Sequence, residues 1–377
     1  MTVVAEVREL NRALGSVSGL IKSANTIAVL DNVLLEASNS LLKVTGHDLS
    51  VSITETIPCE ADRATAFTVN ALHLKQIVSS LPNGAQVAFD YEGETAVNIQ
   101  SGRYTSRMPI LPAADFPPHF NFDTPWRATL STKDLRRALE CAMASGKDGH
   151  EITKYSGITF RPRDGRLEIT GGNGIMISIA WTGLPDGWAH MPTFVAPPGA
   201  MKQILDKSTS IDEIAIDVGE NGLFATVGNW KLGSKLIDVA NPLDALSLFE
   251  MPRERLLRSD GDTFAAALRR CMVVIEAAGK DALNGSQIRV KQSDIGVLLY
   301  TPPIGTGAKA EEAIEVEIEG PDFIAKLNGR QITEALKIVA ADTVEISMSV
   351  EEPRTPVLLR ARGETDRVFL FAPVGVQ

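Results

Sequence analysis

The sequence contains little of what several common protein classes require. Only three cysteines, Cys59, Cys141 and Cys271, occur in 377 residues, which is too few and too scattered for a disulfide framework or a zinc cluster. No stretch reaches about 18 uncharged apolar residues, which excludes a membrane-spanning helix. The first residues also lack the basic-then-apolar layout of a secretory signal. We therefore expect a cytoplasmic protein with reduced thiols and no membrane partner.

Motifs for common enzymatic chemistry are also missing. The chain has no Gly-x-x-x-x-Gly-Lys-Ser/Thr run and no dinucleotide fingerprint, and its five histidines lack metal-ligand spacing. The adjacent carboxylates Asp212 and Glu213 would suit a hydrolase, but the third-repeat counterpart is Asp342-Thr343, so entry into a strand is the favoured role. We predict a protein that is not an enzyme and has no catalytic residues, cofactor or metal.

A segment of about 127 residues occurs three times. Ala-Leu-Glu-Cys-Ala-Met at 138–143 resembles Ala-Leu-Arg-Arg-Cys-Met at 267–272, and a weaker copy starts at Ala13. Leu-Lys-Gln-Ile at 74–77 likewise resembles Met-Lys-Gln-Ile at 201–204. Each second element leads into an alternating, strand-like segment, so the predicted unit is strand, helix, several strands, helix, several strands.

The repeat defines the fold class and the domain boundaries. Proline-containing joins at 109–118, 124–125 and 251–252 place three domains at 1–123, 124–252 and 253–377. We predict an α+β fold in which each domain has antiparallel sheets and two helices packed on one face.

Positive charge is concentrated in the predicted helices although the net charge is −10. Sixteen basic and six acidic residues fall in the helical stretches, against 21 basic and 41 acidic residues elsewhere. These stretches are 8–22, 71–80, 133–147, 202–207, 264–280 and 326–337. Counting the acids that flank them halves the excess but keeps its sign. On helical wheels for the first helix of each repeat, the basic residues lie mainly away from the apolar stripe.

Six helices of one sign in an acidic chain favour binding to a polyanion, although a single basic helix would only indicate a solvated face. Aromatic residues make up 6% of the chain and are not interleaved with the basic ones, which disfavours base stacking on single strands. We therefore predict contacts to duplex phosphates without sequence readout. The residues assigned to this contact are Arg8, Arg12, Lys22, Lys75, Arg136, Arg137, Lys147, Lys202, Arg269 and Lys337.

Four segments, at 25–35, 44–49, 111–117 and 234–238, carry a resemblance to a known family. Leu-Pro-Ala-Ala-Asp-Phe-Pro at 111–117 is the most specific of them. The chain resembles the bacterial DNA polymerase III beta subunit, the beta sliding clamp, over essentially its whole length. The resemblance implies three domains of the DNA clamp type in a head-to-tail homodimeric ring, with sheets outside and helices lining the hole. Such a ring would encircle double-stranded DNA and tether the replicative polymerase, while polymerase subunits and the clamp loader bind through short linear peptides.

The resemblance also assigns site residues. Lys154 and Tyr155, with Lys22, match positions or neighbourhoods where clamps meet tilted DNA. The dimer interface maps to Ser106, where the family usually has an aromatic residue, and to Met108, Val273 and Val274. The groove that receives partner peptides maps to Gly172, Gly174, Ile175, Met176, Ile177, Pro242, Leu370, Phe371, Ala372, Pro373 and Val374.

The groove departs from the family pattern. The usual Thr-Asp-Gly-His-Arg-Leu is replaced by Gly-Asn-Gly-Ile-Met-Ile at 172–177, and the usual Met-Pro-Met-Arg-Leu by Ala-Pro-Val-Gly-Val at 372–376. This leaves an apolar groove without its usual polar rim. The alternative is therefore a divergent second clamp that serves repair or translesion polymerases.

Overall fold

The computed structural model describes residues 1–21, 26–91, 95–146, 153–277, 288–293, 296–301, 307–322, 324–349, 351–352 and 354–373. The chain divides into two compact units. Unit one comprises Met1–Thr132 and Lys202–Leu236, and unit two comprises Lys133–Met201 and Ile237–Gln377.

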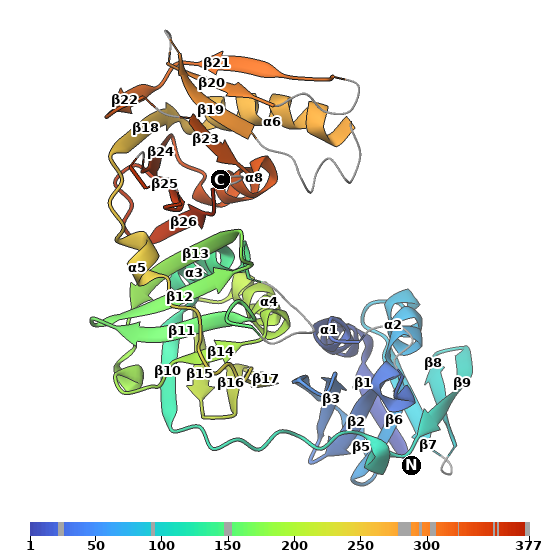
Figure 1. The fold of residues 1–377 in the computed structure, drawn as a ribbon. Helices are drawn as coiled ribbons and strands as arrows, with labels where there is room; N and C mark the ends of the chain where they lie inside the picture. Colours follow the sequence, from blue (N-terminus) through green and yellow to red (C-terminus); the bar gives the residue numbers. More distant parts are fainter. Residues whose placement is uncertain are drawn as a thin grey trace. The chain divides into compact units, whose positions relative to one another are not determined.

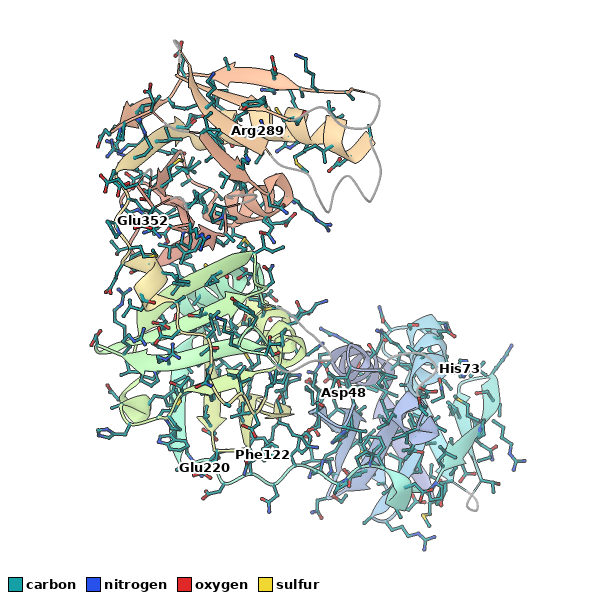
Figure 2. The ribbon with its side chains drawn as sticks, in the orientation of Figure 1. Asp48, His73, Phe122, Glu220, Arg289 and Glu352 are labelled. Carbon is teal, nitrogen blue, oxygen red and sulfur yellow. The ribbon has the colours of Figure 1, made fainter. Side chains whose placement is uncertain are left out.

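Unit one is built on a thirteen-stranded antiparallel sheet with the strand order β10-β15-β16-β17-β4-β3-β2-β6-β9-β8-β7-β1-β5. Its strands are β1 (Thr2–Glu6), β2 (Asn32–Ser38), β3 (Leu41–His47), β4 (Val51–Pro58), β5 (Glu60–Ala61), β6 (Thr65–Asn70), β7 (Gln86–Tyr91), β8 (Ala96–Ser101), β9 (Tyr104–Leu111), β10 (Trp126–Ser131), β15 (Glu213–Val218), β16 (Gly222–Val227) and β17 (Trp230–Lys235). Asp48, labelled in Figure 2, closes the turn from β3 to β4, since its Oδ1 accepts from the Ser50 and Val51 amides at 3.0 and 2.7 Å.

Helices α1 (Val7–Ser18) and α2 (Ala71–Ser80) lie beside each other in unit one (Figure 1). Leu10, Leu14 and Val17 of α1 recur at helical spacing and are buried, so they define the face packed on the sheet. Asn70 caps α2 by accepting from the His73 amide at 3.0 Å. Helix α4 (Pro198–Lys207) begins in unit two and ends in unit one.

Unit two contains a nine-stranded sheet, ordered β14-β11-β12-β13-β26-β25-β24-β18-β22, and a four-stranded sheet, ordered β21-β20-β19-β23. Their strands are β11 (Ile158–Arg163), β12 (Arg166–Gly172), β13 (Met176–Gly183), β14 (Phe194–Ala196), β18 (Arg255–Asp260), β19 (Ile288–Ser293), β20 (Gly296–Tyr300), β21 (Glu311–Ile314), β22 (Glu317–Glu319), β23 (Ile324–Leu327), β24 (Thr343–Met348), β25 (Val357–Ala361) and β26 (Arg367–Phe371). The helices of this unit are α3 (Thr132–Met143), which starts at the boundary, α5 (Leu246–Phe249), α6 (Gly261–Ala277) and α8 (Gly329–Val339).

The element order confirms the predicted α+β class with antiparallel sheets. A strand followed by a helix, several strands, a second helix and three more strands occurs from β1 to β9, from β10 to β17 and from β18 to β26, with additional short elements between some of them. The last strand of the second series, β17, pairs with β4 of the first, and β26 of the third pairs with β13 of the second. Successive series are therefore joined by continuous ladders of backbone hydrogen bonds.

Several predicted helix ends were wrong. The stretch 326–337 was predicted to be helical throughout, but Lys326 lies in strand β23 and the helix begins at Gly329, after the cap Asn328. Helix α4 begins at Pro198 rather than at residue 202, because proline suits the first helical turn. Within the observed bounds the six long helices carry twelve basic and seven acidic residues. The positive excess is smaller than predicted but keeps its sign.

Candidate nucleic-acid and peptide-binding sites

The predicted DNA-binding residues of unit one differ in whether their charged groups form ion pairs within the protein. Arg8 of α1 is exposed. Arg12, one turn later, pairs with Glu9 at 2.8 Å and with Glu55, whose side chain is 1% exposed. The ammonium group of Lys207 lies 3.4 Å from the same buried carboxylate. Arg12 therefore has a structural partner, because a buried carboxylate requires a nearby cation.

The two remaining candidates of unit one are Lys75 and Lys202. Lys75 of α2 donates to the Ser18 hydroxyl at 2.8 Å and thus links α2 to the end of α1. Lys202 is exposed on α4. Lys22 and Lys147 lie outside the described residues.

In unit two the basic residues of the helices are bordered by acids. Arg136 of α3 pairs with Glu140 at 3.2 Å on the same helix, and Arg137 pairs with Glu364. Lys337 of α8 pairs with Glu334 at 2.9 Å. Arg269 of α6 is exposed. The pairs Arg136–Glu140 and Lys337–Glu334 lie at the surface, where such pairs are weak and screened by salt. Glu364, the partner of Arg137, is only 10% exposed.

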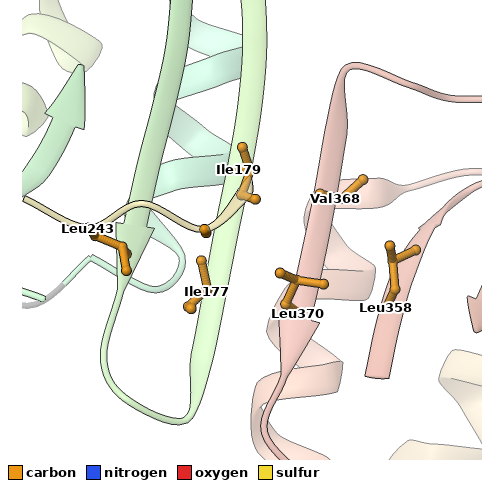
Figure 3. Packing of buried hydrophobic residues seen from close by; sticks show 7 residues of the cluster. Ile177, Ile179, Leu243, Leu358, Val368 and Leu370 are labelled. Carbon is orange, nitrogen blue, oxygen red and sulfur yellow. The ribbon is translucent and has the colours of Figure 1, made fainter. Parts of the chain in front are cut away.

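An apolar cluster in unit two, here called the groove cluster, contains Ile177 and Leu370 of the predicted peptide site (Figure 3). Strands β13 and β26 pair in the register Ile177↔Leu370 and Ile179↔Val368, which places these four side chains on one face. Leu243 and Ala245 from the segment before α5, together with Leu358 of β25, complete the cluster. Tyr155, Trp181, Leu248 and Phe249 pack against it and are partly buried.

A buried ionic network holds the segment that carries Leu243. Glu168 of β12 is 1% exposed and accepts from Arg161 and Arg163 at 3.0 Å each. Arg161 also donates to the Leu243 carbonyl at 3.1 Å, and Arg163 donates to Asp244 at 2.6 Å. The hydrogen bond from Arg163 lowers the pKa of the Asp244 carboxyl. The network thus fixes one wall of the groove cluster to the sheet.

The structure brings only some of the predicted groove residues together. Ile177 and Leu370 are in the groove cluster, whereas their neighbours Met176 and Phe371 form a buried pair at an alternate ladder position and so face away from it. Pro242 is half-buried next to Leu243. Gly172 ends β12 at a position where a Cβ atom would lie 2.8 Å from Leu243 and 2.9 Å from Tyr155.

The turn from β12 to β13 holds two further predicted groove residues. Gly174 has φ +86°, which favours glycine. The Asn173 side chain accepts from the amides of Ile175 and Met176, and the Ala372 amide donates to the Ile175 carbonyl at 2.8 Å. Pro373 is half-buried, and Val374 lies outside the described residues.

Sequence reasoning missed most of the groove cluster. Ile179, Leu243, Ala245, Leu358 and Val368 were not predicted, and Tyr155 was assigned to DNA although it packs against the cluster. Lys154 is exposed, and its ammonium group lies 5.1 Å from the centre of the Tyr155 ring. The alternation of apolar residues along β13 and β26 was the signal that could have identified Ile179 and Val368.

The predicted interface residues lie on β9 and α6. Met108 is 6% exposed, and the half-buried Ser106 has a buried hydroxyl without a hydrogen-bond partner among the described residues. Val273 is 58% exposed on α6, and Val274 is half-buried. Val273 is thus the more exposed of the two valines predicted for the interface.

The described residues contain no group of three His, Cys, Asp or Glu side chains able to hold a metal ion, and none of their helices has the length and hydropathy to cross a membrane. Cys59, Cys141 and Cys271 are buried and unpaired with one another; burial raises the pKa of the Cys141 thiol to about 12. Asp212 and Glu213 are exposed where β15 begins, as predicted for strand entry.

Solved sliding clamps share this fold over the whole chain. The DNA polymerase sliding clamp from Caulobacter crescentus has a TM-score of 0.91 and 23% sequence identity, covering 100% of both chains. The clamp from Bartonella birtlesii, solved with bound griselimycin, has a TM-score of 0.92 and 22% identity, again covering 100% of both. The fold is that of DNA polymerase sliding clamps, as predicted.

Sequence comparison finds similarity to the same group of proteins. Residues 1–121 match the family described as DNA polymerase III beta subunit, N-terminal domain. The chain is 25% identical to the beta sliding clamp of Caulobacter vibrioides (strain NA1000 / CB15N) over 95% of each sequence. It is 22% identical to that of Escherichia coli (strain K12) over 93% of each. The predicted resemblance to the DNA polymerase III beta subunit is confirmed.

Proposed function

We propose that this chain is a beta sliding clamp, a processivity factor without catalysis of its own that encircles duplex DNA and tethers the replicative polymerase. Its three domains would be 1–123, 124–252 and 253–377, as the repeat predicts, and its site of action would be the cytoplasm. The fold shared with solved clamps over the full chain supports this proposal.

The observation that carries the proposal is the pattern of unpaired strand edges. β17 pairs with β4 and β26 with β13, so in both cases the last strand of one series extends the preceding series. Within the described residues β21 pairs only with β20, which leaves its other edge unpaired. Strand β9 pairs with β8 along most of its length and with β6 only at Ile110 and Leu111, so the rest of its second edge is also unpaired. A second copy would join β9 to β21. Such a head-to-tail contact is heterologous, and we propose that the rotation it imposes closes a ring of two copies rather than an open filament.

Charge agrees with this head-to-tail pairing. Arg103 and Arg107 are exposed at and beside β9, whereas β21 carries the exposed Glu311 and is followed by the exposed Glu315. Opposite charges on the two strand edges would steer the copies together and fix their register.

Sizing and imaging test the assembly. Light scattering at known concentration should give the mass of two chains, and negative-stain electron microscopy should show a closed annulus. A monomer, or a dimer without a central opening, would contradict the proposal.

The basic helices supply the proposed DNA contact. Arg136 and Arg269 lie on long helices, where they would touch phosphates without reading bases. The plot of log affinity against log salt concentration has a negative slope. Replacing either residue with alanine should make this slope less steep by about 1 for each lost phosphate contact. Arg362→Ala, an exposed position outside the helices, is the control. An unchanged slope for both helix variants would show that these helices do not contact DNA.

A second candidate is a divergent clamp that serves repair or translesion polymerases, and the altered segment 172–177 favours it. A titration with a peptide carrying the ordinary clamp-binding motif of a polymerase subunit separates the two candidates. Micromolar binding would support the replicative role, whereas millimolar or absent binding would support the second clamp.

A further inference from the structure

Unit one contains a pocket that the proposed function does not use. It has a volume of about 350 Å³ and lies against β3, β4, β16 and β17, with the segment before β10 forming one wall. Its lining combines two lysines, two phenylalanines and hydroxyl groups, namely Lys43, Lys231, Phe120, Phe224, Ser52 and Thr54.

This pocket occupies the same place in the β4–β17 ladder as the groove cluster does in the β13–β26 ladder. The first pairs of the two ladders are Val51↔Ser234 and Met176↔Phe371. Counting from them, the second pairs are Ser52↔Gly233 and Ile177↔Leu370, and the fourth pairs are Thr54↔Lys231 and Ile179↔Val368. The four residues of the second and fourth pairs in the β4–β17 ladder line the pocket. The four corresponding residues in the β13–β26 ladder belong to the groove cluster.

The neighbouring strand extends the correspondence. Phe224 of β16 pairs with Gly233, and Leu358 of β25 pairs with Leu370. Phe224 lines the pocket and Leu358 belongs to the groove cluster. The chain therefore builds one sheet position twice.

The two versions differ in chemistry. The groove cluster has Leu370 where the pocket has Gly233, and a Cβ atom at Gly233 would lie 3.0 Å from Phe224 and 3.1 Å from Phe120. The small residue leaves the pocket open between the rings. Lys231 replaces Val368, and hydroxyl groups replace both isoleucines, so this site is polar and cationic.

The cations of the pocket are accessible. Lys43 and Lys231 are exposed, and the ammonium group of Lys231 lies 4.0 Å from the centre of the Phe224 ring. Lys235 adds positive charge 5.7 Å from the Phe120 ring. The nearby acid Glu36 lies opposite Lys43 in the β2–β3 ladder and is also engaged by His119 at 3.0 Å. The hydrogen bond with His119 lowers the pKa of the Glu36 carboxyl.

We propose that this pocket docks an acidic peptide segment of a partner protein. Carboxylates of the segment would pair with Lys43 and Lys231, and one apolar side chain would enter beside Phe120 and Phe224. The argument that this pocket resembles a peptide-binding groove rests on the proposed function, because that function assigns peptide binding to the groove cluster. The charge and shape of the pocket are independent of the proposed function.

The ring contacts favour a peptide over single-stranded nucleic acid. Phe122, labelled in Figure 2, stacks on Phe120 with ring centres 5.0 Å apart. Lys231 covers Phe224 at 4.0 Å. Because these ring faces already have partners, they offer little surface for base stacking.

The experiment is a fluorescence anisotropy titration of the full chain with fluorescein-labelled Glu-Asp-Trp-Asp-Glu. Lys43→Glu combined with Lys231→Glu should weaken binding by about tenfold or more, since it reverses both contacts. Arg63→Glu combined with Arg362→Glu changes the net charge equally at exposed positions elsewhere and should leave binding unchanged. Gly233→Ala should weaken binding without any change of charge, because its methyl group narrows the pocket. Circular dichroism and thermal melting confirm that each variant is folded.

Three results would overturn the proposal. They are equal affinity of the lysine variant and the control, displacement of the probe by the polymerase-motif peptide, and tighter lysine-dependent binding of a labelled oligothymidine. If the polymerase-motif peptide fails to bind while the acidic probe behaves as expected, the proposed function loses support and the pocket assignment stands.

Discussion

At the scale of single residues, neighbouring basic side chains of α1 have different tasks. Arg12 pairs with the buried Glu55, which also lies near Lys207, while Arg8 is exposed. The same residue type is thus structural at one position and available to a ligand at the other. Burial of the partner decides the difference, because an exposed ion pair contributes little to stability.

Arg12→Ala should lower the free energy of unfolding by about 1–3 kcal/mol, since it removes one of two cations near a buried carboxylate. The loss is limited because Lys207 remains near Glu55 and the Arg12 side chain is 45% exposed. Arg8→Ala should leave the free energy of unfolding unchanged within about 0.5 kcal/mol. Urea denaturation measures both, and equal stability of the two variants would remove the structural role of Arg12.

His47 should make the protein less stable in mild acid. Its Nδ1 accepts from the Leu49 amide at 2.8 Å, so protonation of Nδ1 would break this bond. Burial lowers the pKa of His47. The unfolded chain therefore binds the proton first, and stability falls as the pH drops below the unfolded pKa of about 6.5.

The comparison is with His47→Asn, which keeps an acceptor oxygen near the Nδ1 position. Urea denaturation at pH 7.5 and pH 5 should show a larger loss of unfolding free energy for the natural protein than for the variant. An equal loss in both would show that other groups control the acid response.

At the scale of elements, strand register builds the groove cluster. Ile177, Ile179, Val368 and Leu370 come together because β13 and β26 pair in one register, and a shift by one residue would turn them to the other face. The buried Glu168 network then sets the segment that carries Leu243 against them.

Gly172→Ala should weaken binding of the polymerase-motif peptide by about tenfold. The new methyl group would meet Leu243 and Tyr155 at under 3 Å, which forces these walls of the groove to move. Gly183→Ala is the matched control, since it lies at the end of β13 with open space around it. Isothermal titration measures the affinities, and equal values for the two variants would place the peptide elsewhere.

At the scale of the whole molecule, the proposed ring depends on unpaired edges and exposed apolar surface. The Val273 side chain on α6 is 58% exposed, so contact with a second chain would remove apolar surface from water. The hydroxyl of Ser106, a residue predicted for the interface, is buried without a partner among the described residues. We expect the apolar part of this interface to be small.

Val273→Glu should raise the dimer dissociation constant by about tenfold or more, because a charge would be buried against the partner. Asn221→Glu adds the same charge at an exposed position between β15 and β16 and should leave dimerisation unchanged. Sedimentation velocity over a concentration series measures both. A dimer that resists Val273→Glu would exclude α6 from the interface.

The sequence by itself determined the threefold repeat, the α+β class and the basic character of the helices, because these depend on local periodicity and on similarity at constant offset. Helix ends were less certain, as Lys326 and Pro198 show, because capping depends on the neighbouring backbone.

Only the tertiary structure decided which charges are engaged and which apolar residues form the groove cluster. Glu55 meets Arg12 and Lys207 across separations of 43 and 152 residues. Leu243 and Val368 join one cluster through strand pairings that no local pattern encodes. Strand register brings such residues together, and register is fixed by the packing of the whole sheet.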